Sequence, residues 1–466
     1  MKHSNNRVGA TPKPGRRYSD AVQSPYNIGR GDLVYVTTYG CQMNDHDTER
    51  MLYQLELNQF LQTQDPSEAD VIIINSCSVR EKPVHKVMSE IGTYRPLKAK
   101  NPKLKIGIGG CVGQQEGKNL LAKSRLLDFV FGTDTIDSLP QILQEVRDQN
   151  KRVALTSMDH RGTYEISTLI RNPKVSSFVT ITKGCDNFCS FCIVPFTRGR
   201  EKSRLLSELV TDVKALVERG VKEVTLLGQN VNSYKSPDGS GGFGDLLRAI
   251  CDETQIKRLR FTTSHPKDFD DDLIEILVNY REKLGDFVHL PVQSGSSQIL
   301  ERMNRGYTRE EYLEKVNRLK NKMPHVALST DIIVGFPGET DEDFAQTLSL
   351  IETVGYENVY AFKYSPRPFT KALKYSEQVS EVIKDKRLQE INDLQERLAP
   401  TAIEKYHGQI FPVLVEGPSR TNQNILTGRT THNKVINFDG KMDLIGHIIP
   451  IKVIKAQQFS LRGEVV

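Results

Sequence analysis

The sequence of 466 residues has no run of about 18 apolar residues, so we expect no membrane-spanning helix. Residues 1–31 lack the apolar stretch of a secretory signal, and their polar composition predicts a disordered tail. Only seven cysteines are present. Without a secretory signal, we expect a cytoplasmic protein whose clustered cysteines bind metal rather than form disulfides.

The net charge of the chain does not by itself decide between classes of binding partner. The net charge of +5 is too small to establish nucleic-acid binding. Basic residues do gather at 95–105 and at 198–204, and each group is interpreted either as a solvated surface or as part of a binding patch. Length favours two to four domains, and no internal repeat or heptad pattern is evident.

Three of the cysteines lie within eight residues, at Cys185, Cys189 and Cys192, with the spacing C-x3-C-x2-C. Thiolates at such spacing bind a soft metal or an iron–sulfur cluster. A structural zinc site normally has four protein ligands, so a zinc knuckle with a distant fourth ligand is the alternative. A cubane cluster held by three thiolates would leave one iron open to a substrate or cofactor.

Three further cysteines, Cys41, Cys77 and Cys111, each come just after a predicted strand. The apolar runs 33–38, 71–75 and 105–109, with a fourth at 129–132, alternate with helical patterns and predict an open parallel α/β sheet over 32–150. Ligands bind outside the carboxyl ends of such strands. The three cysteines are therefore predicted to form a second cluster site, and three separate buried cysteines are the alternative.

Residues 171–402 repeat a strand-then-helix rhythm, which predicts a partial (βα)6 barrel of the TIM type with its site at the carboxyl ends of the strands. From 403 to 466 the pattern changes to short β runs with Gly-Pro and Asp-Gly turns, typical of a small antiparallel barrel. The barrel strands of the central domain are predicted at 178–182, 223–228, 258–263, 287–291, 328–334 and 359–363.

The motifs Tyr39–Asn44, Asn75–Glu81 and Gly109–Cys111, together with the central triplet, resemble the radical S-adenosylmethionine (SAM) methylthiotransferases. The resemblance covers nearly all of the chain from about residue 32. It implies two [4Fe–4S] clusters, an auxiliary one on Cys41, Cys77 and Cys111 and one on Cys185, Cys189 and Cys192 whose open iron chelates SAM. It further implies that one SAM yields a radical that activates an adenine C–H while another methylates the sulfur. The end of the chain is similar to the RNA-binding TRAM domain.

The resemblance also implies residues that line the SAM pocket: Gln229, Gln293, Asp331, Gly335, Gly338 and Glu339. His265 and His289 are interpreted as general bases or, more simply, as hydrogen-bonded scaffold. The lone Cys251 is predicted to be a core residue. Phe369 stands where the family usually has glycine, which puts the turn geometry there in question.

The sequence Cys77-Ser78-Val79-Arg80-Glu81 resembles the branch that acts on isopentenylated adenosine beside the tRNA anticodon. Sister branches act on threonylcarbamoylated adenosine or on a ribosomal protein, and a non-catalytic iron–sulfur RNA-binding protein is an alternative of another class. The implied partners are tRNA, an electron donor such as a flavodoxin-like protein, and a sulfur source of unknown identity. No membrane partner is expected.

Overall fold

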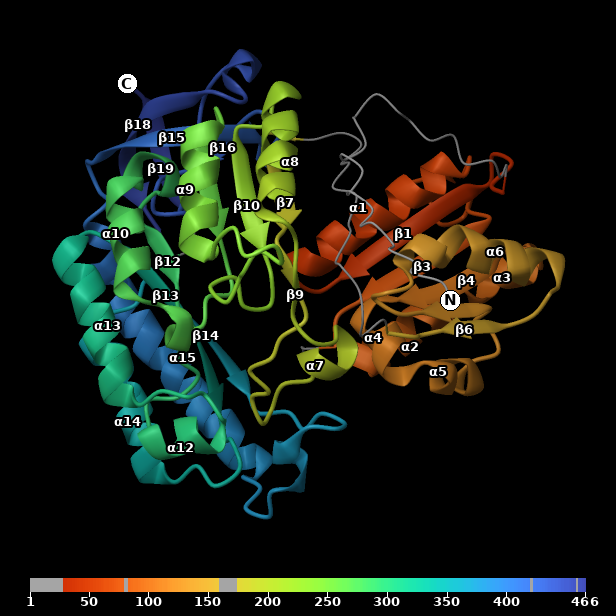
Figure 1. The fold of residues 1–466 in the computed structure, drawn as a ribbon, viewed down its shortest axis with the longest axis horizontal. Helices are drawn as coiled ribbons and strands as arrows, with labels where there is room; N and C mark the ends of the chain where they lie inside the picture. The colour runs from red at the N-terminus through yellow and green to blue at the C-terminus, as the bar shows by residue number, and fades with distance from the viewer. Residues whose placement is uncertain (1–27, 79–82, 159–173, 420–421, 458–459) are drawn as a thin grey trace, which may run out of the picture.

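The computed structural model describes residues 28–78, 83–158, 174–419, 422–457 and 460–466. It has three parts in chain order: an N-terminal sheet domain, a central half-barrel and a small C-terminal barrel (Figure 1). The predicted tail at 1–27 and the motif residues 79–81 lie outside the described residues. Ile28–Gly31 were predicted within the tail, but Ile28 is buried and Gly29 N–H donates to the Asn58 carbonyl at 2.7 Å.

The N-terminal domain is the predicted open parallel sheet, with the strand order β2-β1-β3-β4-β5-β6. The central strand β3 is buried along its whole length, because Val71 and Ile73 pack against one layer of helices while Ile72 and Ile74 pack against the other. The strands are β1 (Leu33–Tyr39), β2 (Leu61–Gln62), β3 (Val71–Ser76), β4 (Lys105–Gly109), β5 (Phe129–Phe131) and β6 (Val153–Leu155).

Helices cover both faces of this sheet (Figure 1). One core includes side chains from α1 and α6, and the other includes side chains from α2, α4 and α5. The helices are α1 (Gln42–Leu57), α2 (Pro83–Thr93), α3 (Arg95–Lys100), α4 (Gly110–Glu116), α5 (Lys118–Lys123) and α6 (Leu139–Asp148), with the 3-10 turn η1 (Ile136–Ser138).

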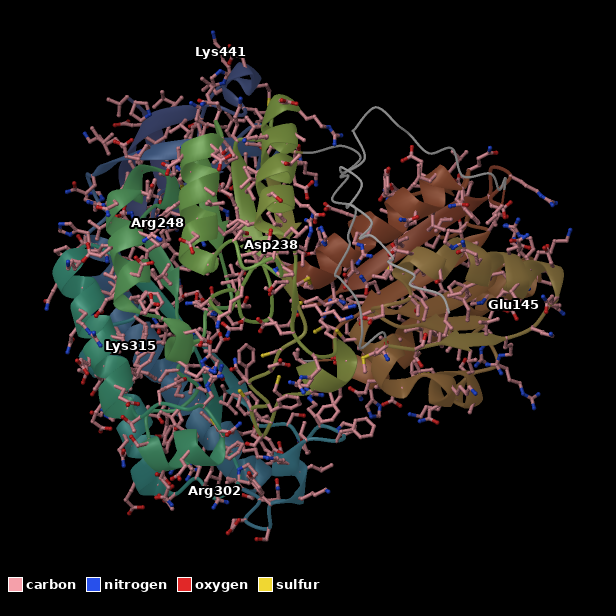
Figure 2. The ribbon with its side chains drawn as sticks, in the orientation of Figure 1. Glu145, Asp238, Arg248, Arg302, Lys315 and Lys441 are labelled. Carbon is pink, nitrogen blue, oxygen red and sulfur yellow. The ribbon has the colours of Figure 1, made fainter. Side chains whose placement is uncertain are left out.

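The central domain contains the six predicted strands as two parallel three-stranded sheets, β7-β10-β11 and β12-β13-β14. Helices between the strands cover the outside, where charged side chains such as Arg248 and Lys315 stand (Figure 2). The strands are β7 (Ser176–Thr180), β10 (Glu223–Leu227), β11 (Arg258–Phe261), β12 (Phe287–His289), β13 (Ala327–Val334) and β14 (Asn358–Lys363).

The helices of this domain begin where the sequence supplies caps. Thr340 and Asp343 form a capping box at the start of α14. Cys251 is buried in α9, as predicted for a core residue. The helices are α8 (Leu206–Glu218), α9 (Phe243–Glu253), α10 (Asp271–Asn279), α11 (Arg281–Leu284), α12 (Ser297–Arg302), α13 (Arg309–Lys322), α14 (Asp341–Val354) and α15 (Glu381–Glu404), with the 3-10 turns η2 (Pro266–Asp268) and η3 (Lys371–Lys374).

The C-terminal domain is a closed five-stranded barrel in the order β15-β16-β17-β19-β18. The barrel was predicted to be antiparallel, and four of its five strand pairs are, whereas β17 and β19 run parallel. Sequence patterns also missed β19, which has only five residues. The strands are β15 (Ile410–Pro418), β16 (Leu426–Arg429), β17 (Val435–Phe438), β18 (Ile448–Ala456) and β19 (Leu461–Val465), with η4 (Met442–Leu444) between β17 and β18.

The C-terminal barrel packs against the amino ends of the half-barrel strands. Arg258, the first residue of β11, donates to the Arg429 carbonyl at 2.7 Å. Glu357, just before β14, accepts ion pairs from Lys405 at 2.6 Å and Lys434 at 2.9 Å. The C-terminal barrel therefore does not cover the carboxyl ends of the half-barrel strands, where the loop with Cys185, Cys189 and Cys192 lies. Within the described residues, no helix has both the length and the apolar character needed to span a membrane.

Candidate functional site

The loop that carries Cys185, Cys189 and Cys192 is held shut at its base. β8 (Thr182–Lys183) pairs antiparallel with β9 (Lys202–Ser203), so the cysteines and the short helix α7 (Val194–Thr197) lie inside a closed loop. Gly184 has φ +77°, and a Cβ there would lie 2.1 Å from the Arg200 carbonyl oxygen. Only glycine allows this close approach, and it lets the Gly184 N–H donate to Gln229 Oε1 at 2.5 Å.

A cavity of about 180 Å³ lies beside this loop, at the carboxyl ends of the half-barrel strands. All three cysteines of the loop line it, and Phe191 and Val194 supply apolar walls. Arg305, which follows α12, also lines the cavity. The remaining lining comes from residues on or just after the strands: Gln229, Thr263, Ser264, His265, His289, Pro291, Gln293 and Asp331.

The structure brings together three of the six residues predicted for a SAM pocket, namely Gln229, Gln293 and Asp331. The turn with Gly335, Gly338 and Glu339 is not part of this lining. Glu339 is buried and accepts hydrogen bonds from the Gly335 N–H at 2.6 Å and from Arg387 at 2.8 Å, while burial raises its pKa to about 7. The carboxylate therefore fixes the turn after β13 instead of facing the cavity.

The two histidines at the cavity behave differently. Burial lowers the pKa of His265 to about 2, its Nδ1 accepts the Lys267 N–H at 3.2 Å, and its buried Nε2 has no hydrogen-bond partner among the described residues. His289 Nδ1 lies 2.8 Å from Ser329 Oγ and its Nε2 lies 3.6 Å from the Asp331 carboxylate. His265 is thus a neutral wall of the cavity, and His289 helps to orient Asp331.

Sequence reasoning missed Arg305, which contacts a cysteine sulfur of the loop. Its guanidinium is buried, donates to Cys189 Sγ at 3.4 Å, and is fixed by the Pro291 carbonyl at 3.0 Å. Burial raises the pKa of Cys185 to about 11 and that of Cys192 to about 12. A fixed cation here compensates the negative charge that ligation of a metal cluster brings.

Cys41, Cys77 and Cys111 converge as predicted from the ends of β1, β3 and β4. The thiol of Cys77 is hydrogen-bonded to both Cys41 and Cys111. Those bonds, helped by the nearby Arg198 charge, lower the pKa of Cys41 and of Cys111 to about 6, and the same two bonds raise the pKa of Cys77. This edge of the sheet therefore holds three sulfur donors with two of them ready to be thiolates.

A buried amide network fixes the strand ends beneath these cysteines. Asn75 Nδ2 donates to the Asn44 carbonyl at 2.8 Å and to Thr48 Oγ1 at 2.9 Å, and its Oδ1 accepts from Asn44 Nδ2 at 3.0 Å. Gly110 has φ +78°, and a Cβ there would lie 2.2 Å from Asn75 Oδ1. Position 110 thus requires glycine, which lets α4 begin directly at the cysteine edge.

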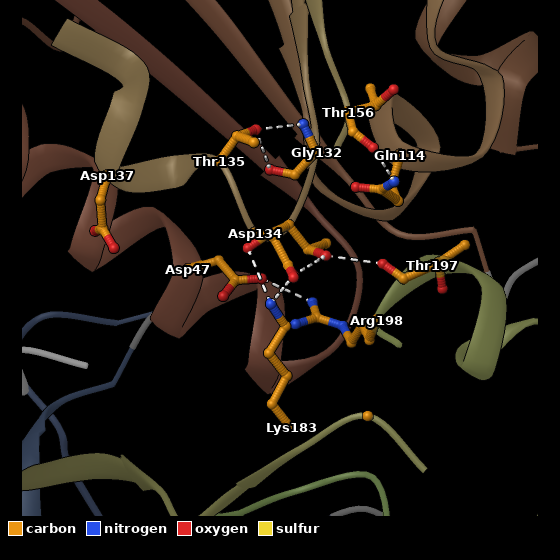
Figure 3. Close-up of polar contacts among 12 residues, drawn as sticks. Asp47, Gln114, Gly132, Asp134, Thr135, Asp137, Thr156, Lys183, Thr197 and Arg198 are labelled. Carbon is orange, nitrogen blue, oxygen red and sulfur yellow. Dashed lines mark hydrogen bonds and ion pairs between the residues drawn. The ribbon is translucent and has the colours of Figure 1, made fainter. Parts of the chain in front are cut away.

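The two cysteine sites face a shared domain joint, which Figure 3 shows. Arg198 of the cysteine loop donates to Asp47 of α1 at 2.7 Å, and both side chains are at most 4% exposed. Lys183 is paired with Asp134, and Thr133 Oγ1 donates to the Thr197 carbonyl at 2.8 Å. The interpretation of 198–204 as a solvated surface was therefore wrong for Arg198 and Arg204, which are buried in ion pairs.

The residues present fit iron–sulfur clusters by donor chemistry, with three thiols at each site and a buried arginine beside each. Across the described ranges, no three His, Cys, Asp or Glu side chains are arranged to hold a single metal ion. A cubane does not need that arrangement, because each cysteine binds a different iron and the sulfurs stay apart.

Three family models match the chain in the order of its domains. They are described as "Uncharacterized protein family UPF0004" over residues 33–132, "Radical SAM superfamily" over 179–351 and "TRAM domain" over 404–466. A relative from Bdellovibrio bacteriovorus named tRNA-2-methylthio-N(6)-dimethylallyladenosine synthase is 52% identical over 447 residues, covering 96% of this chain and 98% of the relative. One of the same name from Syntrophus aciditrophicus is 46% identical, covering 93% and 94%.

The chain belongs to the radical SAM methylthiotransferase family. Membership of this family implies [4Fe–4S] clusters and SAM as cofactors. Among solved structures, the radical SAM methyltransferase TsrM from Kitasatospora setae, with cobalamin and a [4Fe–4S] cluster bound, matches with a TM-score of 0.53 at 14% identity, covering 73% of this chain and 77% of that chain. At that identity the likeness concerns the fold alone.

Proposed function

We propose that this methylthiotransferase adds a methylthio group to C2 of isopentenylated adenosine beside the tRNA anticodon. Cys185, Cys189 and Cys192 would hold the cluster that binds SAM. Cys41, Cys77 and Cys111 would hold the auxiliary cluster. When bound, the cofactors supply one-electron cleavage of SAM and the sulfur and methyl groups for transfer.

The observation that carries the proposal is the joint between two cysteine triads. α7 begins two residues after Cys192 and contacts α4, which carries Cys111. A structural cluster gains from full ligation by four cysteines, but each site here offers three. At each site a cluster would have one iron without a cysteine ligand, and both sites lie at the same contact between two domains. This arrangement suits a reaction that passes a group from one site to the other.

The protein's own residues bind and orient the reactants. Gln229, Gln293 and Asp331 offer amide and carboxylate groups to the polar parts of SAM around the cavity. Arg305 holds a positive charge at Cys189, and Arg198 does the same near Cys41 and Cys111. The apolar side chains at the cavity and the buried joint exclude water from this space.

The isopentenyl branch is favoured over its sisters by the names of the relatives and by the sequence around Cys77. A bulky apolar substituent needs a partly apolar site, and Phe191 and Val194 provide such walls next to the cysteines. The charged threonylcarbamoyl group would instead bring an unpaired carboxylate into the site.

The partners follow from the chemistry and the domains. The TRAM domain and the relatives' names support tRNA as the substrate. The reaction needs an electron, for which we propose a flavodoxin-like donor, and a sulfur source whose identity stays open. A tRNA-modifying role also supports a cytoplasmic location.

The test offers the purified, reconstituted enzyme three anticodon stem-loops that carry unmodified, isopentenylated or threonylcarbamoylated adenosine. We expect methylthio product mainly with the isopentenylated one, measured by mass spectrometry of nucleosides. Loss of contact for five apolar carbons, at about 0.8 kcal/mol each, would cost a few kcal/mol with the unmodified RNA. Preference for the threonylcarbamoyl stem-loop would move the protein to the sister branch, and SAM cleavage with no RNA product would point to the ribosomal branch. Absence of any SAM cleavage would favour a non-catalytic protein.

A further inference from the structure

Exposed phenylalanine and tyrosine side chains occur in only two short segments of the described chain. Five such side chains are at least 38% exposed: Phe188, Phe196, Tyr360, Phe362 and Phe369. The first two belong to the cysteine loop, and the other three belong to β14 and the loop that follows it. Neither the N-terminal sheet domain nor the C-terminal barrel has an exposed Phe or Tyr among its described positions.

These two segments lie against each other at the edge of the cavity. The rings of Phe196 and Phe369 are 5.6 Å apart at an angle of 33°. Between Cys189 and Cys192, the Ser190 carbonyl accepts the Ala372 N–H at 2.9 Å, which ties the loop after β14 to the cysteine loop. Figure 1 shows this loop running next to α7. Tyr360 packs edge-on against His289, a lining residue of the cavity, at 6.1 Å.

Phe369 is held in an unfavourable conformation for a bulky residue. Its φ is +69°, in the left-handed region, and its side chain is 65% exposed. A large residue at positive φ costs free energy, and here the ring gains little burial in return. Strain combined with exposure suits a residue kept for contact with a ligand rather than for packing.

Cations accompany the aromatic residues. The Arg200 guanidinium lies over the Phe188 ring at 5.1 Å, and Lys371 and Lys374 are exposed on η3 just after Phe369. Rings interleaved with positive charges are the recognition pattern for single-stranded nucleic acid, in which bases stack on the rings and phosphates meet the cations.

We propose that this aromatic edge, defined as Phe188, Phe196, Tyr360, Phe362 and Phe369, stacks the unpaired loop nucleotides that flank the target adenosine. The proposal rests on tRNA being the substrate. A base that must enter the cavity has to leave the stack of the loop, and its neighbours then lose a partner. The rings restore that stacking beside the cavity and so hold the loop open.

The test measures binding of an anticodon stem-loop, with 2-aminopurine beside the target adenosine, to the anaerobic holoenzyme without reductant. Phe369→Gly suits the positive φ, so it should fold at least as stably as the parent. We expect it to weaken binding about 5- to 150-fold, the range for loss of one stacked base, and to relieve the quenching of 2-aminopurine fluorescence. Phe369→Tyr should restore both, and the salt dependence should stay unchanged because no charge is removed.

Leu373→Ala is the matched control, since Leu373 is 47% exposed on the same segment but has no ring. Unchanged affinity and quenching in both Phe369→Gly and Tyr360→Ala would overturn the stacking proposal while leaving the proposed function intact. Failure of the parent enzyme to bind the stem-loop at all would instead overturn the proposed function, and the stacking proposal with it.

Discussion

The two cysteine sites reach the same donor set by opposite routes. Cys185, Cys189 and Cys192 lie within eight residues of one loop, 184–201, which the pairing of β8 with β9 closes. Cys41, Cys77 and Cys111 span 71 residues and meet only because three parallel strands end at one edge. The first site is therefore a local structure, whereas the second depends on the fold of a whole domain.

The cysteine pKa values also differ between the two sites. In the loop, burial raises the pKa of Cys185 and Cys192 to about 11 and 12. At the sheet edge, hydrogen bonds with Cys77 lower the pKa of Cys41 and Cys111 to about 6. Contact between the sulfurs thus prepares the sheet-edge site for ligation, while the loop site relies on the Arg305 contact to Cys189.

Cysteine substitutions at one site at a time should separate the two sites most sharply. We expect about eight irons per chain in the reconstituted protein and about four after Cys185, Cys189 and Cys192 are changed to alanine, with loss of all SAM cleavage. Cys41→Ala should still cleave SAM reductively but form no methylthio product. Iron analysis and quantification of 5′-deoxyadenosine and methylthio nucleoside check both results.

Two outcomes would break the division between the sites. Zinc in place of iron would show that the cysteine loop is a zinc knuckle with a distant fourth ligand. Normal methylthiolation by Cys41→Ala would make the sheet-edge site structural only.

Arg198→Gln should damage the sheet-edge site and spare the loop site. The change leaves the buried Asp47 carboxylate without its partner, which costs about 3–5 kcal/mol of folding free energy. It also removes the positive charge near Cys41 and Cys111, so auxiliary iron should fall. Denaturant unfolding and iron content measure the two effects.

Arg200→Gln is the control, because Arg200 is 62% exposed in its pair with Asp186. An exposed pair contributes little to stability, because water and salt screen the two charges. The double variant Arg198→Gln with Asp47→Asn should recover part of the lost stability, since no charge is then buried alone. Equal effects of the two single substitutions would contradict the role given to the buried pair.

The sequence predicted most of what is local. The strand predicted at 328–334 is β13, Ala327–Val334, and the cysteine loop was recognised from spacing alone. What it missed depends on distant residues: the pairing of Arg198 with Asp47 crosses the domain joint, and β17 pairs with β19 around the C-terminal barrel. Glu339 was placed near the cofactor, but its partner Arg387 comes from α15, which no nearby pattern reveals.

His46 gives a smaller, pH-dependent test of the joint that unites the two sites. It is buried, and its Nδ1 lies 3.2 Å from Thr180 Oγ1 of β7. Burial lowers its pKa to about 4; the Asp47 charge acts in the opposite direction, while Arg50, Arg204 and Arg198 add to the lowering. The folded protein therefore keeps a neutral His46 at pH values where the unfolded chain, with an ordinary pKa near 6.5, binds a proton.

Between about pH 6.5 and 4 the unfolded chain binds more protons than the folded protein, so protonation of His46 favours unfolding. Stability should fall with decreasing pH by up to about 1.4 kcal/mol per unit in this window. His46→Gln should flatten this slope in anaerobic urea unfolding between pH 7.5 and 5.5, whereas His85→Gln, at an exposed position of α2, should leave it unchanged. A slope that His46→Gln does not alter would mean that the joint opens enough to hydrate His46, and the two sites would then be less rigidly coupled than the buried contacts indicate.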